Sequence, residues 1–376
     1  MSNNLTVLII GGGLGGLALG QIMRKKDIPF RIFDRDASAS ARSQGWCLTL
    51  HWVINDLISE LPDDILPLLD TVSHLHSYGT TCDAAIYQGI SGEEVTHLAP
   101  SEHGPFIRAD RAKLKEVLST GLSVEYNKHF QRYEETESGV IAHFADGTVV
   151  PGNILVGADG AHSIVRKQLL GHEKAMNYSL PVEVCMGETT LNKSEYEQIF
   201  KDFAKSWYLA EASALFFCGL HSVSQDKSTA QYYWMTCHQQ KDVGPQMSLS
   251  NVEYYHRAAH AVRYMHPKFL LPLYNSTPGG VVNPPISLED FVPPSEGLPR
   301  GRVTLLGDAL HLMTPFRGSG GNFAIKDGLD LGSFIANSDG NISNALQEYA
   351  KLAIPRAAEA VLDSRERTLA WTGDDN

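Results

Sequence analysis

The sequence predicts an α/β fold in which a Rossmann-type domain is interrupted by an inserted, β-sheet-rich domain. The glycine-rich stretch 11–16 lies between a buried apolar run and a helical pattern, as in a βαβ unit. Two further strand-like runs, 154–158 and 302–306, end beside Asp-Gly or Gly-Asp pairs. From about residue 180 the chain instead becomes rich in aromatic and β-branched residues, which is typical of antiparallel strands.

The N-terminal unit contains every part of a dinucleotide-binding motif in the required order. Residues 5–10 (LTVLII) indicate a buried parallel strand, and residues 17–26 have helical spacing and end in basic residues. A second strand, 30–33, then ends at Asp34. Because this order is complete, it favours binding over an ordinary βα turn followed by a surface acid.

The chemistry of this motif comes from its spacing. Gly11, Gly13 and Gly16 follow the GxGxxG pattern, which permits a tight turn and brings backbone N–H groups to a pyrophosphate at a helix N-terminus. A carboxylate about 20 residues later, here Asp34, accepts hydrogen bonds from ribose hydroxyls.

Two more motifs follow predicted strands. Gly157-Ala158-Asp159-Gly160 comes after the run 154–158, and it continues through His162 and Ser163 to Arg166. Gly307-Asp308 comes after the run 302–306, and the glycine cluster 318–321 then begins a helix. Ligands bind at the carboxyl ends of strands in α/β sheets, so we expect Asp308 to face a ligand. The amides that begin the helix suit a site where negative charge develops.

The remaining elements are predicted from periodicity and turn residues. The eight prolines between 267 and 299 indicate a loop-rich stretch, and residues 342–371 should be mostly helical, with an interruption at Pro355. The other expected elements are a helix at 110–119, a strand at 123–126, a hairpin whose second strand is 139–144, and strands at 182–190, 213–221 and 229–238.

Composition excludes several classes of protein. A net charge of −12 argues against a nucleic-acid partner, which needs a basic surface. The five cysteines form no CxxC pair and are odd in number, which argues against a disulfide framework or a zinc site and favours a reduced, cytoplasmic setting. No apolar stretch approaches the roughly 18 residues of a membrane-spanning helix, so we expect no membrane association.

The three motifs, in this order, resemble those of the FAD-dependent monooxygenases of the para-hydroxybenzoate hydroxylase type. The stretch 43–51 (SQGWCLTLH) is also similar to the fungal and tetracycline-inactivating branches of that family. The resemblance covers both ends of the chain and is weak across 175–300, where such enzymes diverge with their substrates. It implies an FAD-binding domain made of 1–78, 100–175 and 300–376, and a substrate domain made of 79–99 and 176–299.

The resemblance also implies a reaction. NADPH or NADH would reduce FAD, and O2 would then form a flavin C4a-hydroperoxide that inserts one oxygen atom into a small, aromatic or polycyclic substrate of secondary metabolism. Hydroxylation, epoxidation and Baeyer–Villiger insertion all stay open, as does the oligomeric state. The chain has no second GxGxxG motif, which agrees with a family whose nicotinamide cofactor has no Rossmann domain of its own.

The resemblance assigns cofactor-binding residues position by position. Asp34 matches the ribose acid, although most relatives have Glu there, and Arg111 matches an arginine that contacts FAD. Leu312 departs from a common Pro and Arg317 from a common Gly. The expected cofactor-binding residues are Gly11, Gly13, Leu14, Gly16, Asp34, Arg35, Gly45, Arg111, Asp159, Gly160, Asp308, Gly320, Gly321 and Asn322.

Several residues keep two interpretations. Arg108 is either a surface arginine or a ligand contact. His256 and His260, with Glu253, have the spacing of metal ligands, but a solvated helix face is the simpler interpretation. His162 and His311 are either proton relays or, as we favour, supporting residues of the flavin motifs. An aromatic substrate pocket or ordinary sheet packing would each explain Trp207, Tyr208, Glu211, Phe216, Phe217, Tyr232, Tyr233 and Trp234.

Two other functions use the same scaffold. An FAD-dependent oxidase or dehydrogenase would bind the same cofactor without inserting oxygen, and a flavin-binding protein without catalysis would conserve only the binding motifs. The sequence identifies no general acid or base, so the catalytic residues stay unassigned.

Overall fold

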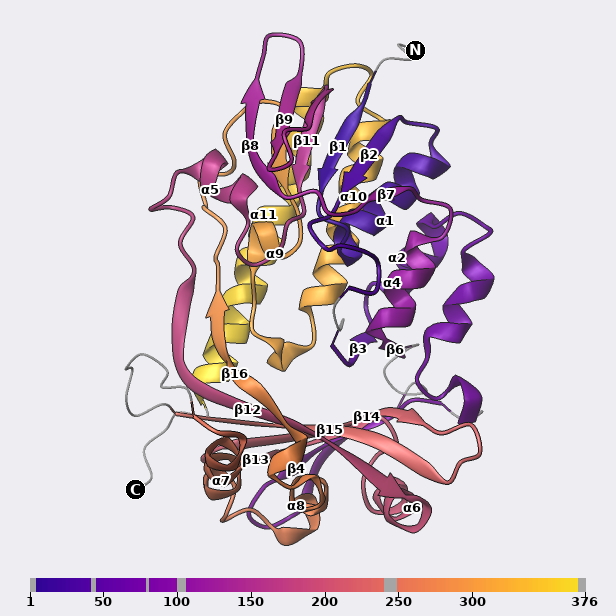
Figure 1. Cartoon of the computed structure of the whole chain (residues 1–376), viewed down its shortest axis with the longest axis vertical. Helices are drawn as coiled ribbons and strands as arrows, with labels where there is room; N and C mark the ends of the chain where they lie inside the picture. The colour runs from indigo at the N-terminus through magenta and orange to yellow at the C-terminus, as the bar shows by residue number, and fades with distance from the viewer. Residues whose placement is uncertain (1–4, 42–44, 79–80, 100–105, 240–248, 371–376) are drawn as a thin grey trace.

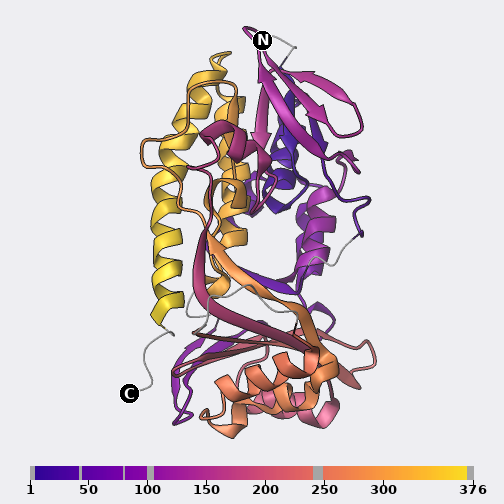
Figure 2. The same ribbon diagram turned by 60° about the vertical axis from the view of Figure 1, so that its left-hand side comes forward.

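The computed structural model describes residues 5–41, 45–78, 81–99, 106–239 and 249–370. A parallel sheet with flanking helices forms the upper part in Figure 1, and a seven-stranded sheet forms the lower part. The long C-terminal helix α11 (Ile342–Leu369) runs along one side, as Figure 2 shows, and reaches the lower sheet. None of the helices in these ranges is long and apolar enough to span a bilayer.

The parallel sheet has the strand order of a Rossmann fold. Its third, second, first, fourth and fifth strands along the chain lie side by side, as β7-β2-β1-β11-β17. The order reverses between β1 and β11, and ligands bind at the carboxyl ends of the strands at such a point. The bounds of the strands are β1 Val7–Ile10, β2 Phe30–Phe33, β7 Val124–Glu125, β11 Ile154–Gly157 and β17 Val303–Leu305.

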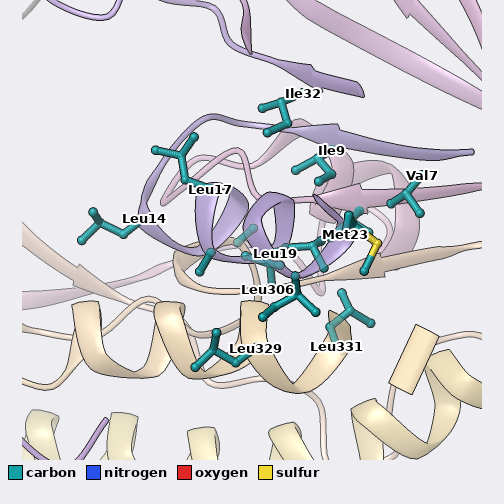
Figure 3. Packing of buried hydrophobic residues seen from close by; sticks show 14 of the residues in the cluster. Val7, Ile9, Leu14, Leu17, Leu19, Met23, Ile32, Leu306, Leu329 and Leu331 are labelled. Carbon is teal, nitrogen blue, oxygen red and sulfur yellow. The ribbon is translucent and has the colours of Figure 1, made fainter. Parts of the chain in front are cut away.

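Helix α1 (Leu14–Lys25) packs between this sheet and helix α10 (Gly320–Ala336), as Figure 3 shows. The two helices approach closely at glycines. A Cβ at Gly15 would lie 2.7 Å from the Ala324 carbonyl oxygen, and one at Gly328 would lie 2.5 Å from the Gly15 carbonyl oxygen. Residues from both ends of the sequence therefore meet behind the glycine-rich turn.

The seven-stranded sheet has the order β16-β12-β15-β14-β13-β4-β5, and only β13 and β4 pair in parallel. Helices α6 (Lys193–Asp202), α7 (Asn251–Ala261) and α8 (Leu271–Ser276) pack on one face, over a core of buried aromatic residues. The strands are β4 Ala84–Gln88, β5 Glu94–Leu98, β12 Tyr178–Asn192, β13 Trp207–Glu211, β14 Leu215–Val223, β15 Thr229–Gln239 and β16 Val281–Asp290.

A two-stranded sheet, β3 (Cys47–Leu50) with β6 (Ile107–Asp110), lies between the upper and lower parts in Figure 1. It contacts α10 on one side and β14 on the other. The other elements are an antiparallel sheet of β8 Phe130–Glu135, β9 Val140–Phe144 and β10 Val149–Gly152, and the helices α2 Ile54–Glu60, α4 Arg111–Ser119, α5 Ile164–Leu170 and α9 Asp308–His311.

The structure corrects three local predictions. The first helix begins at Leu14 rather than at residue 17. The proline-rich stretch contains the ten-residue strand β16, which lies at the edge of its sheet, where proline is tolerated. Helix α11 continues through Pro355, because the ring removes only one N–H and the flanking residues Ile354 and Ala357 are buried.

Candidate functional site

The glycine-rich turn follows β1 at the point where the strand order reverses. Gly11 has φ +118° and approaches the neighbouring strand closely, since a Cβ there would lie 2.1 Å from the Ala158 carbonyl oxygen. A Cβ at Gly16 would lie 2.1 Å from the Gly11 carbonyl oxygen. At Gly13 a Cβ would meet no atom within 4 Å, so this residue borders open space at the N-terminus of α1, beside Leu14.

This difference predicts distinct effects of alanine at Gly13 and Gly16. Gly13→Ala should leave the apoprotein's melting temperature unchanged, because Gly13 has φ −81° and its Cβ has room. FAD affinity should fall several-fold if the open space holds the diphosphate, because the added methyl group would move the diphosphate away from the backbone N–H groups. A hydrogen bond lost in this way costs about 0.5–1.5 kcal/mol. Gly16→Ala should destabilise even the apoprotein. Unchanged FAD affinity in Gly13→Ala, measured by fluorescence titration, would contradict this placement.

Asp34 lies at the end of β2 and is buried against the same turn. Its carboxylate accepts hydrogen bonds from the Gly12 backbone N–H at 2.8 Å and from the Asp36 N–H at 2.8 Å. The side chain of Arg35 is exposed beside it. The carboxylate is therefore held at the edge of the glycine-rich turn, with lone pairs left to accept from a ribose.

Asp159 and Gly160 follow β11, the strand next to β1. Asp159 accepts from Ser163 Oγ at 2.5 Å and from the Ile164 N–H at 2.7 Å, so its carboxylate holds the start of α5. Gly160 has φ +79°, and a Cβ there would meet no atom within 4 Å. Gly160 follows β11 and Gly13 follows β1, and these two strands are neighbours, so the open spaces at the two glycines lie at the same edge of the sheet.

Arg166 connects this second motif to the third, a role that spacing alone did not indicate. Its guanidinium is almost fully buried, and burial lowers its pKa to about 10, so it stays charged at neutral pH. It donates to the carbonyl oxygens of Asp308 at 3.1 Å, Ala309 at 3.2 Å and Ala161 at 2.7 Å. Arg166 therefore holds the backbone of Asp308 beside the end of β11.

Asp308 begins α9 directly after β17. Gly307, with φ +57°, is the N-cap, and no side chain caps this helix. The carboxylate of Asp308 is half-buried and makes no hydrogen bond with the residues that the structure describes. It is thus available to a ligand hydroxyl.

Gly320, Gly321 and Asn322 form the first turn of α10. A Cβ at Gly321 would lie 3.4 Å from Leu48 Cδ1, so this turn is packed against β3. The Asn322 amide is buried and already bonded, since it donates to the Thr49 carbonyl at 2.8 Å and accepts from the His51 N–H at 3.0 Å. Asn322 can therefore offer a ligand only its backbone.

Gly45 and Arg111 lie together at the ends of β3 and β6. Gly45 has φ +80°, and a Cβ there would lie 3.9 Å from Arg111 Nη1. The Arg111 backbone N–H donates to the Trp46 carbonyl at 3.0 Å, while its side chain is exposed. The structure thus brings together two residues that are 66 positions apart (111 − 45).

The two arginines with open interpretations, Arg108 and Arg317, lie in different surroundings. Arg108 is 7% exposed and sits in β6, so the interpretation as a surface residue is wrong for it. Arg317, which stands where many relatives have Gly, forms an ion pair with Asp363 of α11, so its side chain extends toward the last helix. Leu312 ends α9, and its carbonyl accepts from the Phe291 N–H.

The histidines of the flavin motifs differ in burial and in partner. His311 is fully buried and donates to Asp327 at 2.6 Å. His162 is largely exposed and lies 3.8 Å from Glu289. Glu253 forms the capping box of α7 with Ser250, and no cluster of three or more His, Cys, Asp or Glu side chains suited to a metal occurs in the described ranges.

The aromatic residues of the large sheet divide between its two faces. Tyr208, Phe216, Tyr232 and Trp234 lie in the core beneath α6, α7 and α8, which confirms ordinary packing for these four. Trp207, Phe217 and Tyr233 lie on the opposite face. There Tyr233 stacks on Trp46, which lies between Gly45 and β3, with ring centroids 4.6 Å apart. Glu211 forms an ion pair with Arg367 of α11.

The chain matches known flavoenzymes over nearly its whole length. It is 34% identical over 377 residues to the FAD-dependent monooxygenase thnD of Trichoderma harzianum, covering 96% of this chain and 92% of that protein. The chain belongs to the FAD-dependent monooxygenases. Residues 294–364 of this monooxygenase match the FAD binding domain family, and it is 28% identical to the FAD-dependent monooxygenase phnB of Penicillium herquei over 96% of this chain and 89% of that protein.

Solved structures confirm the fold of this monooxygenase. Klebsiella pneumoniae HpxO, crystallised with FAD and uric acid, aligns with a TM-score of 0.79 at 21% identity, covering 99% of this chain and 90% of that one. The tetracycline destructase Tet(55) aligns with a TM-score of 0.71 at 15% identity, covering 98% and 90%. The Rossmann-type domain with a sheet-rich second part is thus confirmed as the fold of this family.

The residues present fit FAD. Open space at Gly13 and Gly160 adjoins the carboxyl ends of β1 and β11, where a dinucleotide binds in this fold. The N-terminus of α1 faces this space, and the unbonded Asp308 carboxylate follows the next strand. FAD is the cofactor of this family, and the protein is an enzyme.

Proposed function

We propose that this monooxygenase uses NADPH or NADH and O2 to insert one oxygen atom into a small aromatic or polycyclic substrate. The observation that supports the substrate class is the aromatic face formed by Trp46, Trp207, Phe217 and Tyr233. It lies next to β3, whose Leu48 contacts the first turn of α10. A flat, ring-bearing molecule suits such a face. HpxO, with bound uric acid, offers a related case of a planar ligand.

We assign the cofactor-binding roles as follows. The turn at Gly11–Gly16 and the N-terminus of α1 would hold the diphosphate, with Leu14 as the first helical residue and Arg35 exposed at the rim. Asp34 would accept from the adenosine ribose and Asp308 from the ribityl chain. The remaining proposed contacts are Gly45, Arg111, Asp159, Gly160, Gly320, Gly321 and Asn322.

Each part of the chain contributes a physical effect to the reaction. Bound FAD, once reduced, supplies the activation of O2. The backbone N–H groups at Gly320 and Gly321 provide the positive end of the α10 dipole, which stabilises negative charge beside them. The aromatic face excludes water and orients the substrate ring. We propose domain limits of 1–78, 100–175 and 300–376 for the FAD-binding part, and 79–99 and 176–299 for the substrate part.

The proposal predicts that the purified yellow protein oxidises NADPH or NADH faster when a true substrate is present. The measurement is a screen of aromatic and polycyclic metabolites for accelerated oxidation of either nicotinamide, with isotopically labelled O2 to trace product oxygen. One labelled oxygen atom in the product supports a monooxygenase reaction of this kind. Oxidised product without label, together with free hydrogen peroxide, would instead indicate an oxidase or dehydrogenase.

A further inference from the structure

We propose that Arg108 is the anchor for an ionised oxygen of the substrate, such as a carboxylate, a phenolate or an enolate. The proposal rests on the proposed function, because it refines the substrate class from a ring-bearing molecule to a ring-bearing anion. The supporting observation is the guanidinium of Arg108, which is buried on the aromatic side of the large sheet. Its hydrogen-bond partners are hydroxyl groups, and one of its N–H groups has no acceptor among the described residues.

The hydrogen bonds of Arg108 use few of its donors. Arg108 pairs with Thr49 across the β3–β6 sheet, and its Nη1 donates to Thr49 Oγ1 at 2.9 Å. Its Nη2 donates to the Tyr233 hydroxyl. The third nitrogen, Nε, is buried and has no acceptor among the residues that the structure describes. A guanidinium carries five N–H donors, so most of them remain for a ligand.

The charge of Arg108 is also uncompensated. Among the described side chains, no carboxylate forms an ion pair with this guanidinium. The carboxylate of Asp110, two residues along β6, accepts instead from the Ala112 and Lys113 N–H groups, and it lies 3.7 Å from His221. Burial of an unpaired charge is costly, and an anion that reaches such a charge is correspondingly favoured.

The titratable neighbours of Arg108 cannot supply the missing negative charge. Burial raises the pKa of the Cys47 thiol to about 12, so it stays neutral. Burial also raises the pKa of Tyr233, although Arg108 opposes this shift. Burial, with help from Arg108, lowers the pKa of His74 to about 3, so this imidazole is neutral as well. At neutral pH none of these three neighbours therefore carries a negative charge.

Tyr233 is positioned to share the ligand with Arg108. Its ring lies across Gly219, where a Cβ would come within 2.7 Å of Tyr233 Cζ. The ring stacks on Trp46 and makes a tilted contact with Phe217. While its oxygen accepts from Arg108, its own O–H can donate to a substrate oxygen. The Phe217 ring lies 5.8 Å from the Arg108 guanidinium carbon. A planar anion would thus meet two polar groups and an aromatic wall.

A cavity lies beside Trp46, the residue that stacks on Tyr233. This cavity of about 240 Å³ is lined by Trp46, Glu188, His221 and Tyr232, among others. The indole N–H of Trp46 donates to Glu188 at 2.5 Å, and its ring covers Tyr233. Trp46 therefore borders the cavity with its N–H side and contacts Tyr233, the partner of Arg108, with its ring.

The test compares matched anionic and neutral probes on the FAD-loaded enzyme, without turnover. The pairs are benzoate with benzamide, 4-nitrophenolate with 4-nitroanisole, and the enolate of 1,3-cyclohexanedione with cyclohexanone, each at a pH above the acid's own pKa. Binding is measured from the change in the flavin spectrum. We expect at least one anion to bind more tightly than its neutral partner, and the three pairs separate carboxylate, phenolate and enolate.

Variants then assign this preference to Arg108. Arg108→Met should reduce the anion's affinity about tenfold or more, the effect of a charged hydrogen bond, and leave the neutral probe unchanged. Gly219→Ala, which keeps the charge but displaces Tyr233, should weaken anion binding with FAD content unchanged. If Arg108→Met does not fold, two other variants still test the proposal. One is Gly219→Ala, and the other is Arg108→Lys, which keeps the positive charge but lacks the paired N–H donors of a guanidinium.

Two results would overturn the proposal: no preference for any anion in the wild type, or the same preference in Arg108→Met or Gly219→Ala. These outcomes are independent of the oxygenation reaction. An Arg108-dependent preference in an enzyme that oxidises neither NADPH nor NADH would refute the proposed function and leave the anion site standing.

Discussion

Asp327→Asn should lower the free energy of unfolding of the apoprotein by about 3–5 kcal/mol, the effect of removing one partner from a buried ion pair. Asp327 is fully buried. Its carboxylate accepts from His311 Nε2 at 2.6 Å, from Arg356 Nη2 at 2.9 Å and from the Gly307 N–H at 2.9 Å. An amide leaves these donors without a counter-charge. Gly307 is the N-cap of α9 and His311 is its last residue, so both ends of the helix that begins at Asp308 depend on this carboxylate.

The matched control is Asp330→Asn. Asp330 pairs with the same arginine, at 2.9 Å from Arg356 Nη1, but it is partly exposed and also meets Lys326. Its loss should cost no more than about 1 kcal/mol. Urea unfolding of the two variants beside the wild type measures the difference, and equal unfolding midpoints for both variants would contradict the assigned role of Asp327.

The same pair predicts a pH dependence. Burial opposes both shifts, yet attraction between the partners lowers the pKa of Asp327 below 3.8 and raises that of His311 above 6.5. The carboxylate's contribution is complete above 3.8 and is lost as the pH falls through its folded pKa. The imidazolium's contribution is complete below 6.5 and is lost as the pH rises through its folded pKa. The stability gap between wild type and Asp327→Asn should therefore be widest between these values.

Asp308→Ala should lose FAD affinity by roughly tenfold or more while the apoprotein keeps its melting temperature. Removing a charged acceptor from a buried hydrogen bond costs about 1.5–3 kcal/mol, which corresponds to this change in affinity. Asp308 could instead cap the start of α9. The geometry does not support this role, since Gly307 is the N-cap and no side chain bonds to the helix start.

Paired measurements decide between these roles for Asp308. FAD titration of the apoprotein by fluorescence gives the dissociation constant, and thermal unfolding without FAD gives the stability. Asp308→Asn, which keeps an acceptor oxygen but loses the charge, should fall between wild type and alanine. A folded Asp308→Ala protein with unchanged FAD affinity would refute the ribityl assignment, and a destabilised apoprotein would restore the capping role.

Much of the Rossmann-type part was predictable because its signals are local. The apolar run ending at Ile10, the glycines and Asp34 occupy about thirty consecutive residues, so their order alone implies a βαβ unit. The second hairpin strand at 139–144 and the helix at 110–119 were predicted for the same reason, and the structure places β9 and α4 there.

Where the sequence prediction failed or stayed open, contacts with residues distant in the sequence determined the local structure. Pro355 does not end α11, because buried contacts on both sides of it hold the helix. The alternation of β15 showed that half of its aromatic residues face a core, but the pairing with β14 and the helices beneath determined that Tyr233 belongs to the other half.

By itself, the sequence determined the strand–glycine–helix–acid order, the three motifs and hence the family and its cofactor. Only the tertiary structure showed that Arg108 is buried, because its hydroxyl partners, Thr49 and Tyr233, lie 59 and 125 residues away. The same holds for Asp327, whose three donors come from β17's end, α9 and α11. A sequence motif indicates the structure and binding chemistry of residues that are close along the chain. Burial and charge compensation depend instead on which distant side chains the fold brings together.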